Sequence, residues 1–108
     1  MELNDYQKQA LRTLNPELTE KDILINGVMG LCGESGEAID IVKKHLAQGH
    51  PLDREGLAKG LGDVCWYLAE AAYAIGYDLE KICSLNLDKL RKRYPDGFDA
   101  ARSRDRKA

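Results

Sequence analysis

Apolar residues recur at helical spacing along most of the chain, and prolines and glycines divide this pattern into four stretches. The first predicted helix begins at Asn4, a capping residue, with Gln7 at the capping-box position, and the second begins at Thr19. The predicted helices span, approximately, residues 4–14, 19–48, 53–75 and 78–94. No stretch alternates apolar and polar residues as a half-buried strand does. The pattern therefore predicts an all-α fold.

The second and third predicted helices are apolar on more than one side. On the third, Trp66 and Tyr67 lie off the main apolar stripe, and on the second, Ala38 and Ile41 do the same. The main stripe of the third helix consists of Leu57, Leu61, Val64, Cys65, Leu68, Ala72 and Ile75. A helix that is apolar on two sides is usually packed between neighbours. One chain has few helices to cover both sides, so we expect a four-helix-type bundle completed by oligomerisation.

The chain has 108 residues, which suits a single domain over residues 1–108 whose last segment, about 99–108, is a basic tail. A frayed, solvated end is the expected state of that tail, from Arg102 to Lys107. The formal net charge of −2 argues against stable nucleic-acid binding, which needs a basic excess to neutralise phosphates. No apolar run is long enough for a membrane span, and the N-terminus carries no signal pattern.

Three cysteines, Cys32, Cys65 and Cys83, lie far apart inside apolar helical patterns. Their odd number and the absence of a CxxC pair favour neither a zinc site nor a disulfide framework. Buried free thiols in a reducing compartment are expected, and with them a cytoplasmic location.

Acidic residues mark the candidate chemistry. Glu34 and Glu37 are three positions apart on a helix, so their side chains are neighbours, and they share a sector with Ala38 and Ile41. Carboxylates at a covered surface need partners, and no lysine or arginine stands within one turn of Glu34. If the second and third helices run antiparallel, Asp63 faces this pair. Such hard oxygen ligands suit Mg²⁺, with Mn²⁺ as the alternative, and a salt-bridged core is the competing interpretation.

A glycine recurs at every third position of the second helix, each costing roughly 1 kcal/mol relative to alanine. These residues are Gly27, Gly30, Gly33 and Gly36. Close helix approach and room for a ligand near Glu34 are two explanations. A kink or break in the helix is the third.

Three segments of the chain carry a family resemblance. They are Gly30-Leu-Cys-Gly-Glu-Ser-Gly-Glu-Ala-Ile-Asp40, Gly62-Asp-Val-Cys-Trp-Tyr-Leu68 and Asn86-Leu-Asp-Lys-Leu-Arg-Lys-Arg-Tyr-Pro-Asp-Gly-Phe98. Together with the N-terminal Asn4-Asp-Tyr-Gln7, they resemble the small, single-domain MazG-like nucleotide pyrophosphohydrolases. The resemblance implies a helical homodimer or homotetramer. It also implies an enzyme of nucleotide-pool housekeeping that hydrolyses nucleoside triphosphates, with Mg²⁺, to the monophosphate and pyrophosphate.

The resemblance also implies roles for individual residues. Catalysis and metal binding fall to Glu34, Glu37 and Asp63. Substrate binding falls to Lys89 and Arg93 at the phosphates, Asn86 at the sugar or base, and Tyr67 beside it. The competing interpretations are a solvated helix face for Lys89 and Arg93 and plain core packing for Tyr67.

The chain departs from the family pattern at one position. Gly60 stands where a fourth carboxylate, a glutamate three residues before Asp63, is expected, and Asp40 is the better of the nearby substitutes. Two other hypotheses therefore stay open. One is a catalytically impaired nucleotide-binding or regulatory homologue, and the other is a purely structural helical oligomer.

Overall fold

The computed structural model describes residues 1–106, and Lys107 of the predicted tail lies outside them. The elements in order are α1 (Leu3–Ala10), the 3₁₀ turn η1 (Leu11–Thr13), α2 (Glu20–Gln48), α3 (Arg54–Ala74), α4 (Leu79–Arg93) and α5 (Ala100–Arg104). The all-α class is thus confirmed, and the described residues form no strand. None of their helices has the length and apolar character that crossing a bilayer requires.

The helix caps follow the sequence closely at three of the four predicted starts. Thr19 caps α2, Asp53 caps α3 and Asp78 caps α4, each by accepting a hydrogen bond from a backbone N–H of the first turn. Helix α2 ends at Gln48, and the φ of 72° at Gly49, the next residue, is the left-handed conformation that glycine adopts without strain. Local chemistry therefore accounts for these boundaries.

The predicted start of the first helix is wrong. Helix α1 begins after Glu2, whose backbone N–H donates to the carboxylate of Asp5 at 3.3 Å. Asn4 lies inside the helix, and its side-chain oxygen accepts from the Glu80 N–H at 3.0 Å. Two residues that looked like a local cap, Asn4 and Gln7, instead reach other elements. The physical reason is that a tertiary partner satisfies a polar side chain as well as a neighbouring backbone group does.

Gln7 joins α1 to α3 and to the start of α4. Its amide nitrogen donates to the carbonyls of Ala69, at 3.1 Å, and Tyr77, at 3.3 Å, and its oxygen accepts from the Leu79 N–H at 3.0 Å. The buried apolar residues among those described, Ala69, Ala72 and Leu79, cluster at this junction. A buried amide with three partners compensates its own desolvation and positions the helices it joins.

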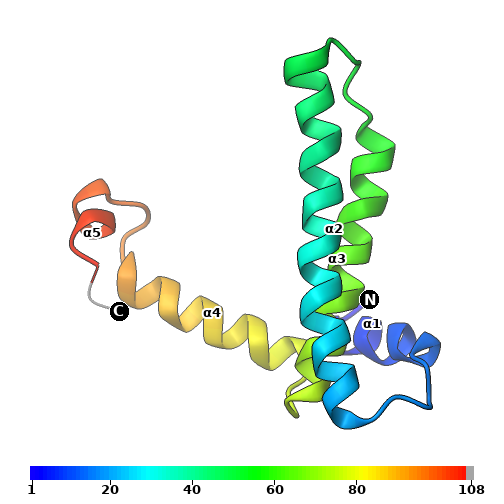
Figure 1. Ribbon diagram of the computed structural model, residues 1–108. Coiled ribbons are helices and arrows are strands. Elements are labelled where there is room, and N and C mark those ends of the chain that lie inside the picture. The colour runs from blue at the N-terminus through cyan, green and yellow to red at the C-terminus, as the bar shows by residue number, and fades with distance from the viewer. Residues whose placement is uncertain (107–108) are drawn as a thin grey trace.

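Helices α2 and α3 form an antiparallel hairpin (Figure 1). A Cβ on Gly27 would lie 2.9 Å from the backbone nitrogen of Ala71, and a Cβ on Gly30 would overlap the ring of Tyr67. Gly33 and Gly36 have open space instead. Close approach therefore explains the first two glycines, and α2 is continuous, so the predicted alternative of a break is wrong.

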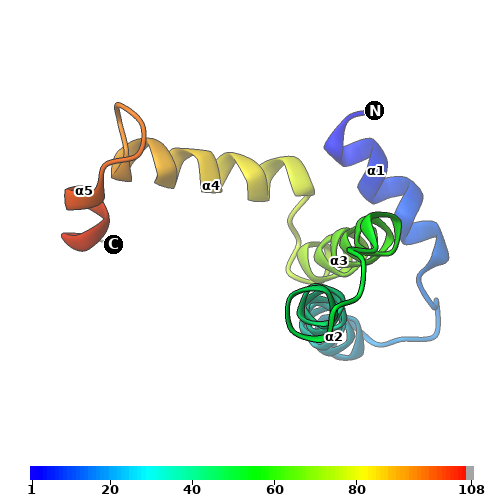
Figure 2. The same cartoon turned by 90° about the horizontal axis from the view of Figure 1, so that it is seen from above.

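Helix α4 leaves the base of the hairpin and extends away from it (Figure 1), and a view from above places α1 and α4 on different sides of α3 (Figure 2). The Cα radius of gyration is 16.9 Å. A compact domain of this length has about 13 Å. A single chain is therefore an open hairpin with an arm, and it leaves much of its apolar surface uncovered.

The tail and the cysteines also differ from expectation. Residues Ala100–Arg104 form the short helix α5 at the end of the arm, where a frayed tail was predicted. Cys32 and Cys65 are exposed and Cys83 is half-buried, so the prediction of buried thiols is wrong for the single chain. Helix α5 forms because Asp99 caps it, and the thiols of Cys32 and Cys65 are exposed because nothing among residues 1–106 covers them.

Candidate functional site

The acidic residues gather at the middle of the hairpin. Glu34 and Asp63 line one open pocket of about 370 Å³, together with Trp66 and Tyr67. Glu37 lies one turn after Glu34 on α2 and is exposed. The antiparallel hairpin thus brings Glu34 and Asp63 together, as their positions in the sequence suggested.

Glu34 occupies an unfavourable place for a charged group. Its side chain is half-buried, and its Oε2 atom is buried with no hydrogen-bond partner among the described residues. Desolvation raises the pKa of the Glu34 carboxyl, and the charge of Glu37, a hydrogen bond to the Glu37 side chain and the charge of Asp63 raise it further. Like charges together with an unpartnered oxygen leave a demand for a cation or a proton.

The side chains present fit Mg²⁺ better than a metal ion that is coordinated by protein ligands alone. No three aspartates, glutamates, histidines or cysteines of the described residues converge as a preformed metal site. Mg²⁺ usually keeps several waters and takes only one or two carboxylates together with substrate phosphates. Glu34, with its unpartnered oxygen, and Asp63, in the same pocket, supply ligands of that kind.

Gly60 lies on the same face of α3 as Asp63 and Tyr67, since positions three and seven residues apart align on a helix. A Cβ built on Gly60 meets nothing within 4 Å. The position that lacks the expected carboxylate therefore has room for one.

The nearby acids are engaged elsewhere. Asp40 pairs with Lys44 at 3.0 Å and with Lys43 at 3.8 Å, and a hydrogen bond from Lys44 lowers the pKa of the Asp40 carboxyl. Glu70 is fully buried and accepts from the Asn26 amide at 2.9 and 3.0 Å. Neither acid lines the pocket of Glu34, and each has a polar partner elsewhere.

Two aromatic residues form the wall of the acidic pocket. The Tyr67 ring packs on the backbone of Gly30, in space that any side chain at that position would fill. Trp66 meets Tyr67 edge to face at 5.1 Å, and its indole N–H is held by the Ala10 carbonyl at 3.0 Å and the Thr13 hydroxyl at 2.9 Å. Trp66 was not among the predicted site residues. Its position off the main apolar stripe was the available signal.

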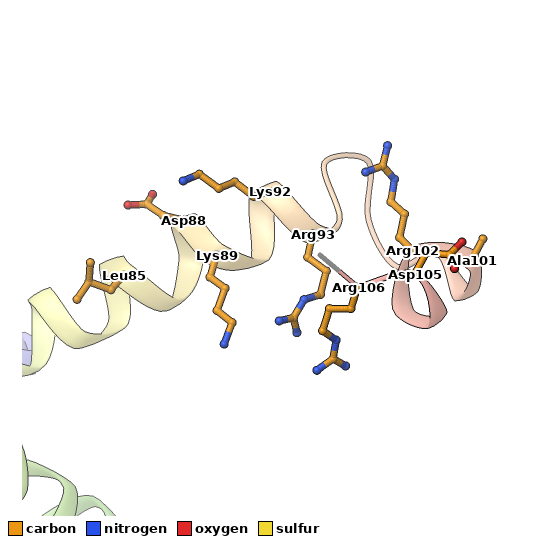
Figure 3. Close-up of a pocket in the computed structure, with 9 residues that line it drawn as sticks. All are labelled: Leu85, Asp88, Lys89, Lys92, Arg93, Ala101, Arg102, Asp105 and Arg106. Atoms are coloured by element: carbon orange, nitrogen blue, oxygen red, sulfur yellow. The ribbon is translucent and has the colours of Figure 1, made fainter. Parts of the chain in front are cut away.

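The predicted phosphate-binding residues lie elsewhere on the chain. Lys89 and Arg93 line a second, larger pocket of about 820 Å³ between α4 and α5 (Figure 3). The arm carries this pocket away from the hairpin (Figure 1). Asn86 is exposed on α4 and lines neither pocket. Within one chain, the acidic residues Glu34 and Asp63 therefore lie in a different pocket from the basic residues Lys89 and Arg93.

Comparison with known proteins supplies the family. The model of the MazG nucleotide pyrophosphohydrolase domain matches residues 26–98, a range that contains Glu34, Asp63, Lys89 and Arg93. The Gene 37 protein of Mycobacterium phage L5 is 38% identical over 73 residues, and the match covers 64% of this chain and 64% of that protein. No solved structure matches the chain. On the extent of the domain match, the chain belongs to the MazG nucleotide pyrophosphohydrolase domain family.

Proposed function

We propose that this chain is a Mg²⁺-dependent nucleoside triphosphate pyrophosphohydrolase that releases the nucleoside monophosphate and pyrophosphate. The observation that carries the proposal is the Glu34 carboxylate, with its unpartnered buried oxygen, in one pocket with Asp63 and beside Glu37. Membership of the family supports the class of reaction.

The chemistry asks for charge neutralisation and an aligned water. Bound Mg²⁺ would neutralise charge on the phosphate oxygens, held by Glu34 and Asp63 with Glu37 close by. The water oxygen forms a bond to the α-phosphorus, and the bond from that phosphorus to the α–β bridging oxygen breaks, so that pyrophosphate leaves. A carboxylate of this set that is not occupied by the cation takes the proton from the water. Trp66 and Tyr67 shield the pocket on one side.

We further propose a homo-oligomer as the working form. Within one chain, Lys89 and Arg93 lie on the arm and Glu34 lies on the hairpin (Figure 1). A substrate whose phosphates contact both groups needs the arm of one copy to approach the hairpin of another. Helix α2 offers an exposed apolar face for such packing, formed by Ile25, Val28, Met29, Ile39 and Leu46.

Gly60 favours a second candidate, a nucleotide-binding or regulatory homologue with impaired turnover. A multi-carboxylate metal site that lacks one ligand binds its metal more weakly. The two candidates share the fold and the phosphate contacts, and they differ in whether pyrophosphate is released.

A pyrophosphate-release assay with Mg²⁺ across the common ribo- and deoxyribonucleoside triphosphates separates the two candidates. We expect release by the wild-type chain and a roughly 10- to 100-fold gain in Gly60→Glu, because the added carboxylate has room beside Asp63. Gly62→Glu is the matched control, since it adds the same charge to open space on another face of α3.

The outcomes have distinct meanings. Nucleotide binding without release in the wild type, restored to turnover by Gly60→Glu, supports the impaired homologue. Release that is unchanged in Gly60→Glu contradicts the metal assignment. No release and no nucleotide binding from either protein leaves the structural oligomer.

A further inference from the structure

The end of the chain is folded back against α4 by specific local contacts. Gly97, with a φ of 95°, closes a turn in which its N–H donates to the Tyr94 carbonyl at 3.2 Å. The rings of Tyr94 and Phe98 pack at 5.6 Å, and the Asp99 side chain caps α5. These interactions place α5 beside the last two turns of α4. Residues 99–106 are thereby a structural part of the arm.

The pocket between α4 and α5 is strongly cationic. Its charged lining consists of five basic residues, Lys89, Lys92, Arg93, Arg102 and Arg106, and two acidic ones, Asp88 and Asp105. The formal charge of the lining is therefore five minus two, or +3. Asp88 also forms an ion pair with Arg91 at 3.2 Å, so part of its negative charge is neutralised by a residue outside the pocket lining. Such a lining favours an anion.

Three of these cations point to the same side of the arm. Figure 3 shows the side chains of Lys89, Arg93 and Arg106 directed together, while those of Lys92 and Arg102 point elsewhere. The Nε atom of Arg93 is buried and has no acceptor among residues 1–106. A buried guanidinium N–H without an acceptor is unfavourable, and an anionic oxygen would satisfy it. The arrangement therefore favours an anion with several oxygens.

A phosphate chain is the anion that fits these three aligned cations best. Guanidinium groups bind phosphate oxygens through paired hydrogen bonds, and lysine adds a point charge. Three cations, two on α4 and one shortly after α5, can bind successive phosphates, whereas a single carboxylate offers only two oxygens. A long nucleic acid is disfavoured by the overall charge of −2 and by the two aspartates in the lining.

We propose that Arg106 is a further phosphate-binding residue, which joins Lys89 and Arg93 to hold the terminal phosphates of a nucleoside triphosphate. The identity of the nucleotide rests on the proposed function. Binding of the phosphate chain itself does not, because it requires neither the acidic pocket nor turnover. The inference adds a role for the basic tail.

The test uses inorganic triphosphate as the probe and the full-length chain, with affinity measured by titration calorimetry at low and high salt. We expect Arg106→Gln to weaken binding about tenfold, the size of one charge-assisted hydrogen bond. Arg104→Gln is the matched control, since it removes the same charge from α5 at a position that does not line the pocket. We expect the control to change affinity less than twofold.

The results distinguish this inference from the proposed function. Equal weakening by Arg106→Gln and Arg104→Gln would mean general electrostatic attraction, and no binding by the wild type would also overturn the inference. If triphosphate binds through Arg106 and no nucleotide is hydrolysed, the inference stands and the enzyme assignment fails. If nucleotides are hydrolysed and Arg106→Gln leaves KM unchanged, the enzyme assignment stands and the inference about Arg106 fails. For an active chain, we expect KM to rise while kcat changes little.

Discussion

Glu34 is the residue at which stability and function oppose each other. Its carboxyl loses solvation, lies beside Glu37 and Asp63, and keeps one oxygen without a partner. A fold selected for stability alone would place an amide or an apolar group there. Functional sites often retain such unfavourable groups because the ligand supplies the missing interaction.

The raised pKa of the Glu34 carboxyl predicts a pH-dependent loss of stability in the presence of a chelator. A folded-state pKa above the ordinary 4.5 means that the folded chain binds the proton more tightly than the unfolded chain. The stabilising contribution is therefore complete below pH 4.5 and is lost as the pH rises through the raised value. Glu34→Gln, which is neutral throughout, should be more stable than the wild type at neutral pH and nearly equal to it in acid.

Urea unfolding of both proteins between pH 4 and 8 measures this difference. The exposed, distant Glu17→Gln serves as the control. A gap between Glu34→Gln and the wild type that stays constant with pH would contradict the role assigned to the carboxyl charge. Mg²⁺ should stabilise the wild type more than the variant, since a bound cation relieves the repulsion.

At the scale of the elements, the glycines of α2 fall into two kinds. Gly27 and Gly30 allow α3 to approach, one against the Ala71 backbone and the other against the Tyr67 ring. Gly33 meets only open space. Helical spacing already implies that glycines three positions apart cannot all serve one contact, and the position of α3 shows which of them do.

Alanine substitutions at Gly27 and Gly33 should change the free energy of unfolding in opposite directions. Gly27→Ala places a methyl group against the α3 backbone, which cannot move aside cheaply, and we expect a loss of about 1–2 kcal/mol after its gain in helix propensity. Gly33→Ala meets no obstacle and should stabilise α2 by roughly 0.5–1 kcal/mol. Thermal and denaturant unfolding measure both. Equal stabilisation by the two variants would mean that α2 and α3 do not pack closely at Gly27.

At the scale of the whole molecule, a single chain buries few of its apolar side chains. Its buried apolar residues are confined to Ala69, Ala72 and Leu79 within residues 1–106. One face of α2 leaves a row of apolar side chains exposed, namely Ile25, Val28, Met29, Ile39 and Leu46. Large contiguous apolar surface of this kind is typical of subunit interfaces.

We expect the chain to form an oligomer of at least twice its 12.1 kDa mass, measured by light scattering after size exclusion. Ile39→Lys should shift the mass toward that of one chain and lower Tm, because Ile39 is 63% exposed in the middle of the apolar row. Gln48→Lys, at the exposed end of α2, is the control and should leave the mass unchanged. A wild type that stays monomeric at high concentration would contradict the expectation and the shared-site proposal with it.

The sequence by itself determined the features that depend on near neighbours. The starts of α2, α3 and α4 follow from Thr19, Asp53 and Asp78, since a cap bonds within its own first turn. The position of Glu34 and Asp63 in one pocket followed from helical spacing and from the short connection between two antiparallel helices. Both inferences required only the periodicity of a helix.

Only the tertiary structure decided which distant groups meet. Gln7 and Asn4 bind α4 because residues more than 70 positions away come within hydrogen-bond range. The direction of the arm separates Lys89 and Arg93 from Glu34, and the fold of α5 brings Arg106 beside them. No local pattern encodes these distances, because they depend on the summed packing of several helices rather than on the geometry of one.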